Sequence, residues 1–417
     1  MNVEDMVLVS IDDHVIEPPG MFDQHVPAAW RDRAPQLITD EVGIQRWHFD
    51  DSIAGSMGLN AVVGWPKDEW GMDPTTFAEM RPGAYDIHER VRDMNRNGIL
   101  GSMCFPSFVG FAGNFFLQAK DKEASLVMTR AYNDWHIDEW VGTYPDRFIP
   151  LAVPPIWDAQ LVADEMRRVA AKGCQAMTMP ELPHVFGLPS YHNMEYWGPV
   201  FQAACDAQVV LCMHIGGGFQ ALKTAPDGPI DNLIVLATQV SALAAQDLLW
   251  GPAFRSYPDL KVAWSEGGIG WIPFYLDRCD RHFENQKWLH HDFGGKLPSE
   301  VFREHSLACF VSDPTSLKLR HDIGIEIIAW ECDYPHSDSV FPNAAEFVHN
   351  EMALAGCSDS DIEKISWENS CRFFDWDPFR NRTRAEATVG HLRSLATDVD
   401  VTIRSRHEWR ELYNAVR

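Results

Sequence analysis

Residues 6–14 of the chain read MVLVSIDDH, an apolar and β-branched run that ends in Asp12-Asp13-His14. The first six of these residues predict a buried β-strand. Side chains alternate along a strand with a period of two, so we expect Asp12 and His14 to point to the same side. Together they can offer a carboxylate oxygen and an imidazole nitrogen to one metal ion. A hydrogen-bonded turn is the alternative for this motif when it stands alone.

Three further predicted strands end in residues of the same kinds. The apolar runs 209–213, 262–264 and 325–330 lead to His214, to Glu266, and to Asp333 with His336. In a parallel α/β barrel the carboxyl ends of all strands lie on one face, and the active site forms there. The four strand ends therefore predict a metal enzyme.

Eight short β-prone runs can be recognised along the chain, at 7–11, 99–105, 147–153, 174–179, 209–213, 261–264, 307–311 and 326–330. Segments with helical periodicity lie between most of them, at 85–98, 158–173, 194–208, 232–254 and 273–285. This alternation predicts an α/β fold, the closed (β/α)8 TIM barrel. An open, doubly wound sheet is the alternative. It favours a glycine-rich turn after the first strand, where this chain has Asp12-Asp13-His14.

Two regions do not follow the alternation. A long insertion after the first strand, residues 36–83, carries Trp47, Phe49, Met57, Trp65, Trp70, Met72, Phe77 and Met80. We expect it to form an apolar lid at the catalytic mouth, and a hairpin with its own small core is a compatible alternative. Residues 376–417 are expected to form a C-terminal helical extension that packs on the barrel or on a neighbouring subunit. The barrel itself is expected to span residues 1–375.

Composition restricts the partners and the compartment. The formal net charge of -25 argues against nucleic acid and anionic membranes as partners. The nine cysteines include no CxxC pair, which favours free thiols in a reducing compartment over a disulfide framework. No signal peptide is apparent, and no apolar run approaches the ~18 residues of a membrane span. We therefore expect a soluble, cytoplasmic protein.

Further carboxylates and a histidine lie near the same strand ends. Glu17 is expected to be either a metal ligand or a carboxylate that orients His14. Asp333 is placed to bind a metal ion or to take a proton from its water, and His336 and Asp338 can reach the same site around a turn. The alternative for His336 is a cap on the following helix.

These motifs resemble the amidohydrolase superfamily, and more narrowly its amidohydrolase-2 branch, which includes aminocarboxymuconate semialdehyde decarboxylase and resorcylate decarboxylases. The resemblance covers residues 6–375 and rests on Asp12-x-His14, His214 and Asp333-Tyr334-Pro335-His336. It is strengthened by Asn133-Asp134-Trp135, Tyr144-Pro145-Asp146-Arg147-Phe148 and Gly270-Trp271-Ile272-Pro273. It implies that Asp12, His14, His214 and Asp333 hold one divalent metal ion, commonly zinc or manganese.

The chain departs from that branch after the sixth strand. The decarboxylases usually carry a histidine followed by glycines there, and this chain has Ser265-Glu266-Gly267-Gly268. The change adds an anion near the cation, which argues against decarboxylation of an acidic substrate. Glu266 is instead expected to be a general base or a ligand of a second metal ion. A second ion is also suggested by the surplus of candidate ligands over the three or four that one zinc ion needs: Asp12, His14, Glu17, His214, Glu266, Asp333 and His336.

The sequence favours a metal-dependent hydrolase that activates water against a small organic substrate with apolar surface. The expected cofactor is one zinc, manganese or iron ion with room for a second, and the expected catalytic residues are Glu266, Asp333 and His336. The first alternative is a non-haem iron monooxygenase, with one or two irons, on the same fold. The others are a non-oxidative decarboxylase and a non-catalytic binding protein. We expect a homo-oligomer, in the simplest case a dimer.

Overall fold

The core of the protein is a barrel of parallel strands. The computed structural model describes residues 1–71, 73–217 and 224–416. Within them, parallel strands form two sheets, with the orders β1-β5-β6 and β11-β10-β9-β8-β7. The strands are β1 (Val9–His14), β5 (Gly101–Phe105), β6 (Phe148–Ile149), β7 (Ala176–Thr178), β8 (Val210–His214), β9 (Val262–Ser265), β10 (Ser306–Phe310) and β11 (Ile328–Trp330). Each overlaps one of the eight predicted runs.

Two contacts close these sheets into one barrel. A parallel bridge between Ala152 and Met177 joins the end of the first sheet to the start of the second. At the other seam, the backbone N–H of Asp333 donates to the carbonyl of Asp12 over 2.8 Å. The predicted (β/α)8 barrel is confirmed, and the open doubly wound sheet does not describe this chain.

The strand sequences divide their side chains between two apolar layers. Val9 and Ile11 of β1 belong to the cluster inside the barrel. Leu8 belongs to the larger cluster that packs the strands against the helices. This alternation is the period of two that a strand imposes. Because both faces are covered, the strands read as continuous apolar runs, as parallel strands do.

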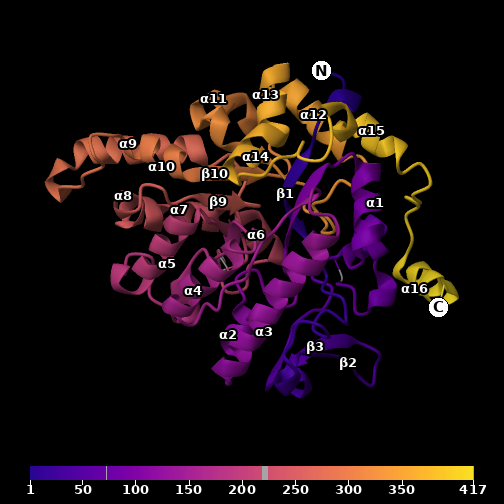
Figure 1. The fold of residues 1–417 in the computed structure, drawn as a ribbon. Coiled ribbons are helices and arrows are strands. Elements are labelled where there is room, and N and C mark those ends of the chain that lie inside the picture. Colours follow the sequence, from indigo (N-terminus) through magenta and orange to yellow (C-terminus); the bar gives the residue numbers. More distant parts are fainter. Residues whose placement is uncertain (72, 218–223, 417) are drawn as a thin grey trace.

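Helices surround the strands (Figure 1). They are α1 (Ile87–Asn97), α2 (Asn114–Gln118), α3 (Lys122–Trp135), α4 (Ala159–Ala170), α5 (Met194–Ala207), α6 (Ile230–Leu236), α7 (Gln239–Trp250), α8 (Ala253–Ser256), α9 (Ile272–Asn285), α10 (Pro298–His305), α11 (Arg320–Ile323), α12 (Ala344–Leu354), α13 (Asp359–Glu363) and α14 (Asn369–Phe373). The helical segment predicted over residues 232–254 is divided among α6, α7 and α8. Among the described residues no single helix has the length and apolarity of a bilayer span, although α6 and α7 together, bent by 42°, do.

The insertion is built on a small antiparallel sheet of β2 (Gln36–Thr39), β3 (Gln45–Phe49) and β4 (Ser52–Ile53). Of its apolar residues, Trp47, Phe49, Met57, Trp65, Phe77 and Met80 are buried, whereas Trp70 is half-buried and Met72 lies outside the described residues. The backbone N–H groups of Val62 and Val63 donate to the carbonyl of Pro335 over 3.0 and 3.1 Å. The insertion therefore has its own core and also contacts the loop that follows β11.

The C-terminal extension carries α15 (Val389–Ser394) and α16 (Arg406–Val416). In α15, Leu392 packs beside Val7, two residues before β1. In α16, Arg410 contacts the buried carboxylate of Glu79 in the insertion. The extension thus packs on both the barrel and the insertion of its own chain.

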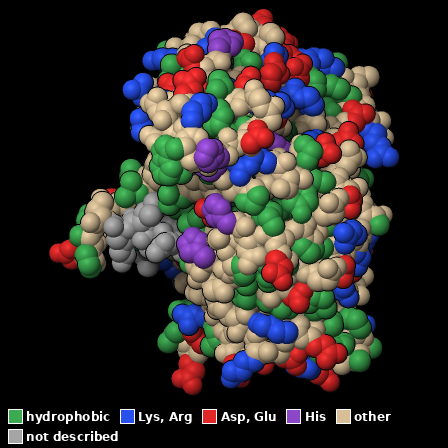
Figure 2. Space-filling model, turned by 90° about the vertical axis from the view of Figure 1, so that its left-hand side faces the viewer, with side chains coloured by type: hydrophobic (Ala, Val, Ile, Leu, Met, Phe, Trp, Pro, Cys, Tyr) green, Lys and Arg blue, Asp and Glu red, His purple; other side chains and the backbone are tan. Residues whose placement is uncertain are grey.

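A pocket opens on the outer surface of the helical layer. Its volume is about 500 Å³, and it is lined by His192, Gln246, Asp247, Trp250, Arg278, Cys279, His282 and His291. Figure 2 shows several histidine side chains (purple) on the face that carries α8 and α9. The nine cysteines are all unpaired and seven of them are buried, as expected for free thiols.

Candidate metal centre

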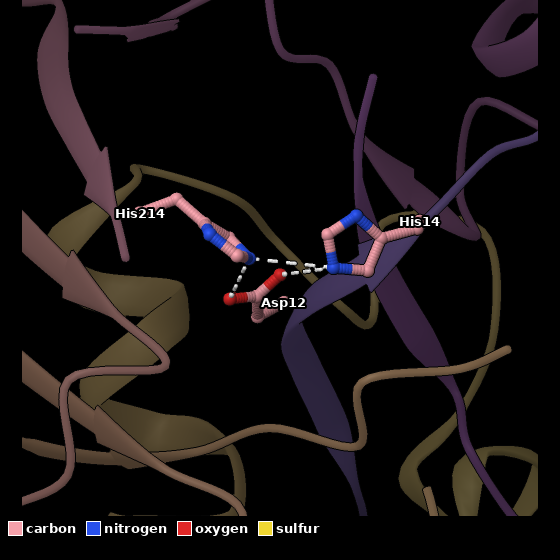
Figure 3. Close-up of side chains that lie close together, drawn as sticks. All are labelled: Asp12, His14 and His214. Carbon is pink, nitrogen blue, oxygen red and sulfur yellow. Dashed lines mark hydrogen bonds and ion pairs between the residues drawn. The ribbon is translucent and has the colours of Figure 1, made fainter. Parts of the chain in front are cut away.

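Three side chains converge where β1 and β8 end (Figure 3). The Nε2 atom of His214 lies 3.2 Å from Oδ2 of Asp12 and 3.3 Å from Nε2 of His14. Nε2 of His14 lies 3.6 Å from Oδ1 of Asp12. All three side chains are buried. The predicted Asp-x-His pair therefore lies on one side of β1 and meets the histidine of β8.

Neighbouring groups fix how these ligands point. Nδ1 of His214 lies 2.5 Å from the carbonyl of Ile215, which can only accept a hydrogen bond. Nδ1 therefore carries the proton and Nε2 keeps a free lone pair, which is the form that binds a metal ion. On β1, the guanidinium of Arg90 donates to the carbonyls of His14 and Gly83 and holds the strand end in place.

The loop after β11 brings Asp333 and His336 to the same place. Oδ1 of Asp333 lies 3.1 Å from Nε2 of His14 and 2.9 Å from Nδ1 of His336. The rings of His14 and His336 stack with their centroids 3.7 Å apart. Asp333 adopts a left-handed backbone conformation, with φ of 57°. Asp333 and His336 thus join Asp12 and His214 around His14.

Glu266 enters the site from the end of β9. Its Oε2 atom lies 3.5 Å from Nε2 of His214, and its side chain is 19% exposed. Its backbone N–H donates to Oε1 of the buried Glu331 over 3.0 Å. Glu266, Asp333 and Asp338 form a further group whose ligand atoms lie within 4.8 Å of one another. The residue at which the sequence departs from the decarboxylase pattern therefore lies beside His214.

Glu17 belongs to none of these groups of candidate metal ligands. Its two oxygens accept hydrogen bonds from the backbone N–H groups of Ser107 and Phe108, over 2.8 and 3.1 Å. Burial raises the pKa of Glu17 to about 7, against the effect of those hydrogen bonds. Glu17 holds the segment after β5, and the same segment carries Phe111. Of the two predicted roles, the geometry fits support of the site and does not fit direct ligation.

The electrostatics of the centre favour a bound cation. Burial raises the pKa of Asp12 well above its usual range, and the charges of Glu266 and Asp333 add to this. Burial also raises the pKa of Glu266 to about 8, with Asp333 as the next cause. Burial lowers the pKa of His14. All these shifts disfavour charged forms in the absence of a cation.

Hydrogen bonding leads to the same conclusion. Both carboxylate oxygens of Asp12 and Oδ1 of Asp333 are buried and make no hydrogen bond of good geometry, although histidine nitrogens lie nearby. Buried polar atoms nearly always have partners, so these oxygens call for a bound group. Two histidines and two carboxylates at one face form a donor set that suits a divalent ion such as zinc, manganese or iron. The residues present therefore fit a metal ion.

The structure adds residues to the site that the sequence did not single out. Phe105 and Phe111 pack against the ring of His214, with centroids 4.8 and 4.1 Å away. Glu331 lies buried behind Glu266. Glu331 could have been identified from the sequence, because it directly follows the apolar run of β11. Phe111 could not, since it lies in a loop whose path depends on Glu17.

The chain matches known proteins over most of its length. A family model described as amidohydrolase matches residues 23–376. A γ-resorcylate decarboxylase of Polaromonas sp. (strain JS666 / ATCC BAA-500) is 23% identical over 347 residues, which cover 78% of this chain and 96% of the relative.

Two solved structures share the fold. One is an amidohydrolase from Mycobacterium avium subsp. paratuberculosis K-10, with a TM-score of 0.68, 20% identity, and coverage of 88% of this chain and 97% of its own. The other is a dihydroxybenzoic acid decarboxylase from Polaromonas sp. JS666 with bound manganese and the inhibitor 2-nitroresorcinol. The two structures align with a TM-score of 0.58 and 22% identity, and the alignment covers 77% of this chain and 92% of the decarboxylase chain.

Proposed function

The chain belongs to the amidohydrolase-2 branch of the amidohydrolase superfamily, and from this premise we propose that it is a metal-dependent hydrolase. Asp12, His14, His214 and Asp333 would hold the ion. When bound, a divalent ion would lower the pKa of a coordinated water to about 7 and polarise the bond to be cleaved. The protein's own side chains must then receive the proton and orient the substrate.

The observation that carries the proposal is the position of Asp333. Its Oδ1 is buried, makes no hydrogen bond of good geometry and lies 2.9 Å from Nδ1 of His336. Burial, and next the charge of Asp338, raise the pKa of Asp333, which makes its carboxylate a better proton acceptor. Asp333 can therefore take the proton of the attacking water and share it with His336, which returns it to the leaving group.

The charge of the site favours a neutral substrate. Asp12, Glu266 and Asp333 contact only histidines as basic groups, and none pairs with a lysine or arginine within the described part of the chain. A substrate carboxylate would therefore meet negative charge instead of a guanidinium. This favours hydrolysis of an uncharged bond, such as an ester, amide or lactone, over decarboxylation of an acid.

The walls of the site favour a substrate with apolar surface. The rings of Phe105 and Phe111 flank His214. The insertion contacts the loop of Asp333 through Val62, and Asn60 donates to the hydroxyl of Ser337 over 3.0 Å. We therefore propose that residues 36–83 act as a lid. Protease cleavage within them should slow when Mn²⁺ is added to the metal-free protein, and equal cleavage rates would contradict the lid.

Non-oxidative decarboxylation is the second candidate. It is favoured by the relatives, since a γ-resorcylate decarboxylase matches 78% of this chain and a dihydroxybenzoic acid decarboxylase holds manganese on the same fold. Manganese is for the same reason the first metal to test, ahead of zinc and iron. Oxygen consumption by the iron-loaded protein would instead support the oxygenase.

The test supplies the Mn²⁺-loaded protein with uncharged aryl esters, amides and lactones in ¹⁸O-labelled water, and in parallel with dihydroxybenzoates. We expect ¹⁸O in the acid product of an uncharged substrate and no release of CO₂. Asp333→Asn should slow hydrolysis at least about 10²-fold, the range for loss of a general base. Release of CO₂ from a dihydroxybenzoate without any hydrolysis would overturn the proposal in favour of the second candidate.

A further inference from the structure

Helix α16 lies in the C-terminal extension and packs against the insertion. After α15 the chain runs along the outside of the molecule to α16 (Figure 1). Trp409 of α16 is buried in a small cluster with Val62 and Trp65 of the insertion. We propose that α16 positions the loop after β11 through this segment of the insertion, and that Trp409 and Arg410 are positioning residues for the reaction.

Gly64 is the point at which the extension meets the insertion most closely. Its carbonyl accepts the backbone N–H of Arg404 over 2.8 Å and the indole N–H of Trp409 over 3.4 Å. A Cβ atom on Gly64 would lie 3.2 Å from the ring of Trp409, and the φ of Gly64 is +89°, where other residues are strained. The backbone of the insertion is therefore shaped to receive this indole.

A buried carboxylate holds α16 in one orientation. Glu79 is fully buried, and its Oε1 atom accepts from the guanidinium of Arg406 over 3.2 Å and from that of Arg410. Its Oε2 atom accepts from the backbone N–H of Thr75 over 2.6 Å. Burial acts to raise the pKa of Glu79, but the hydrogen bonds from Thr75 and Arg406 outweigh it and lower the pKa. The carboxylate is therefore charged, and it needs the guanidiniums of α16 as partners.

The same segment of the insertion contacts the loop after β11. The N–H groups of Val62 and Val63 donate to the carbonyl of Pro335 over 3.0 and 3.1 Å. Pro335 directly precedes His336, the residue proposed to return the proton to the leaving group. Val62 also belongs to the cluster of Trp409, so α16 and this loop meet at one residue. The inference rests on the proposed function, because it takes that role of His336 as given.

The position of His336 determines how well it can transfer a proton. Its ring is buried, stacks on His14 with centroids 3.7 Å apart, and lies 2.9 Å from Asp333 through Nδ1. A misplacement of about 1 Å can slow a reaction by about 10²-fold, even when its cause lies far from the reacting atoms. The contact between Pro335 and the insertion fixes the backbone beside His336. Release of α16 should therefore slow proton transfer without removing a metal ligand.

Few contacts need to be broken to release α16. Within its described residues only Trp409 is buried, and the others are half-buried or exposed. The side chain of Arg410 is 46% exposed although it reaches Glu79. Trp409→Ala and Arg410→Met thus remove the two kinds of contact separately. Trp288→Ala replaces a tryptophan that is 69% exposed and is the matched control.

The first test measures backbone hydrogen exchange by mass spectrometry on the Mn²⁺-loaded protein. Peptides covering residues 60–65 and 335–339 should exchange at least about 10-fold faster in Trp409→Ala, because their hydrogen bonds open more often. Trp409→Phe should keep most of the protection, and peptides of α5 should be unchanged in every variant. Wild-type exchange rates in both segments of Trp409→Ala would overturn the proposal. This measurement needs no turnover, so its outcome is independent of the proposed hydrolysis.

The second test measures steady-state kinetics on an uncharged ester at a temperature at which all variants are folded. We expect kcat to fall about 10-fold in both Trp409→Ala and Arg410→Met, with Mn²⁺ affinity near wild type and activity largely restored in Trp409→Phe. Arg410→Met decides the matter should Trp409→Ala not fold. A lower melting temperature with wild-type kcat in both variants would show that α16 only stabilises the fold, and would overturn the proposal. A wild type that hydrolyses no ester would instead contradict the proposed function, and the exchange rates would then decide the positioning role.

Discussion

Two regions of this barrel are rich in histidine, and they differ in what surrounds the rings. At the strand ends, His14 and His214 are buried and lie within 3.6 Å of a carboxylate. In the outer pocket, His282 and His291 lie against Trp250, with ring centroids 5.3 and 5.2 Å away. In the described residues, groups with the spacing of metal ligands occur at the strand ends and not in the outer pocket.

The difference shows which property makes a metal site. Histidines occur in both places, so their number does not decide it. The strand ends add carboxylates that have lost water without gaining hydrogen bonds, and a cation restores what these oxygens lack. In the outer pocket the rings have aromatic contacts, and His192 lies 3.1 Å from Asp247. His192 and His282 are exposed and His291 is half-buried, so water can reach and satisfy their ring nitrogens.

The largest expected effect is on Mn²⁺ affinity, when one histidine of each region is replaced by alanine. His214→Ala should weaken Mn²⁺ binding by more than about 10²-fold, since loss of a ligand should exceed the 10- to 100-fold cost of losing a residue that only orients one. His282→Ala should leave Mn²⁺ affinity unchanged. Isothermal titration calorimetry on both variants measures the contrast. Full manganese affinity in His214→Ala would remove His214 from the ligand set and with it the basis of the comparison.

The fold could be predicted because its signal is local. Parallel strands covered on both faces appear as apolar runs, and all eight runs became strands of the barrel. The break between α6 and α7 could not be read in the same way, since residues 232–254 stay apolar across it. The lid, the domain limits, the dimer and the cellular compartment stay predictions.

The site was partly predictable for a similar reason. Asp12, His14, His214, Glu266 and Asp333 each lie within three residues of the carboxyl end of a strand, so their chain position placed them at one face. Glu17 was ambiguous, because the sequence does not reveal that the backbone of Ser107 and Phe108 would occupy both of its oxygens. Whether a carboxylate meets a cation or an N–H group depends on how distant segments pack.

The second prediction separates proton transfer from metal binding at the strand ends. His336→Gln removes the group 2.9 Å from Oδ1 of Asp333 and leaves Asp12, His14 and His214 in place. We expect kcat to fall about 10²-fold, the lower range for general acid–base catalysis, while KM and the affinity for Mn²⁺ stay near wild type. Steady-state kinetics on an uncharged ester, together with metal analysis, test this. An unchanged kcat would show that His336 only packs against His14.

The third prediction concerns a buried histidine that has no carboxylate beside it. His136 is buried in the π-helical turn after α3, and neither ring nitrogen has a hydrogen bond of good geometry. Burial lowers its pKa to about 4, against a hydrogen bond with the backbone of Cys104. Between this value and its ordinary pKa of about 6.5, the unfolded chain binds more protons than the folded one. Stability from this residue is therefore complete above pH 6.5 and is lost as the pH falls toward 4.

The expected loss is between about 1 and 2 kcal/mol from pH 6.5 to pH 5, because the slope approaches 1.36 kcal/mol per pH unit only below pH 6. Urea unfolding of the wild type and of His136→Phe at a series of pH values measures it as a difference, in which the titrations of the other histidines cancel. Phenylalanine suits this site because the ring of His136 already stacks on Tyr132. Parallel stability curves for the two proteins would mean that His136 carries a proton in the folded state, and burial alone would then not keep a histidine of this barrel neutral.

The smallest effect is expected where the comparison began, at the outer pocket. His192 and Asp247 are side by side, but the histidine side chain is half exposed to water. An ion pair in such a position contributes about 0–1 kcal/mol, because solvent and salt screen it. His192→Ala should therefore change the unfolding free energy by no more than this amount, and the change should shrink at high salt. Mn²⁺ stoichiometry should stay at the wild-type value, since the remaining histidines of the pocket have no carboxylate cluster to complete a ligand set. Loss of a manganese ion in this variant would show that aromatic and surface-exposed histidines can bind metal here without buried carboxylates, and the distinction between the two regions would fail.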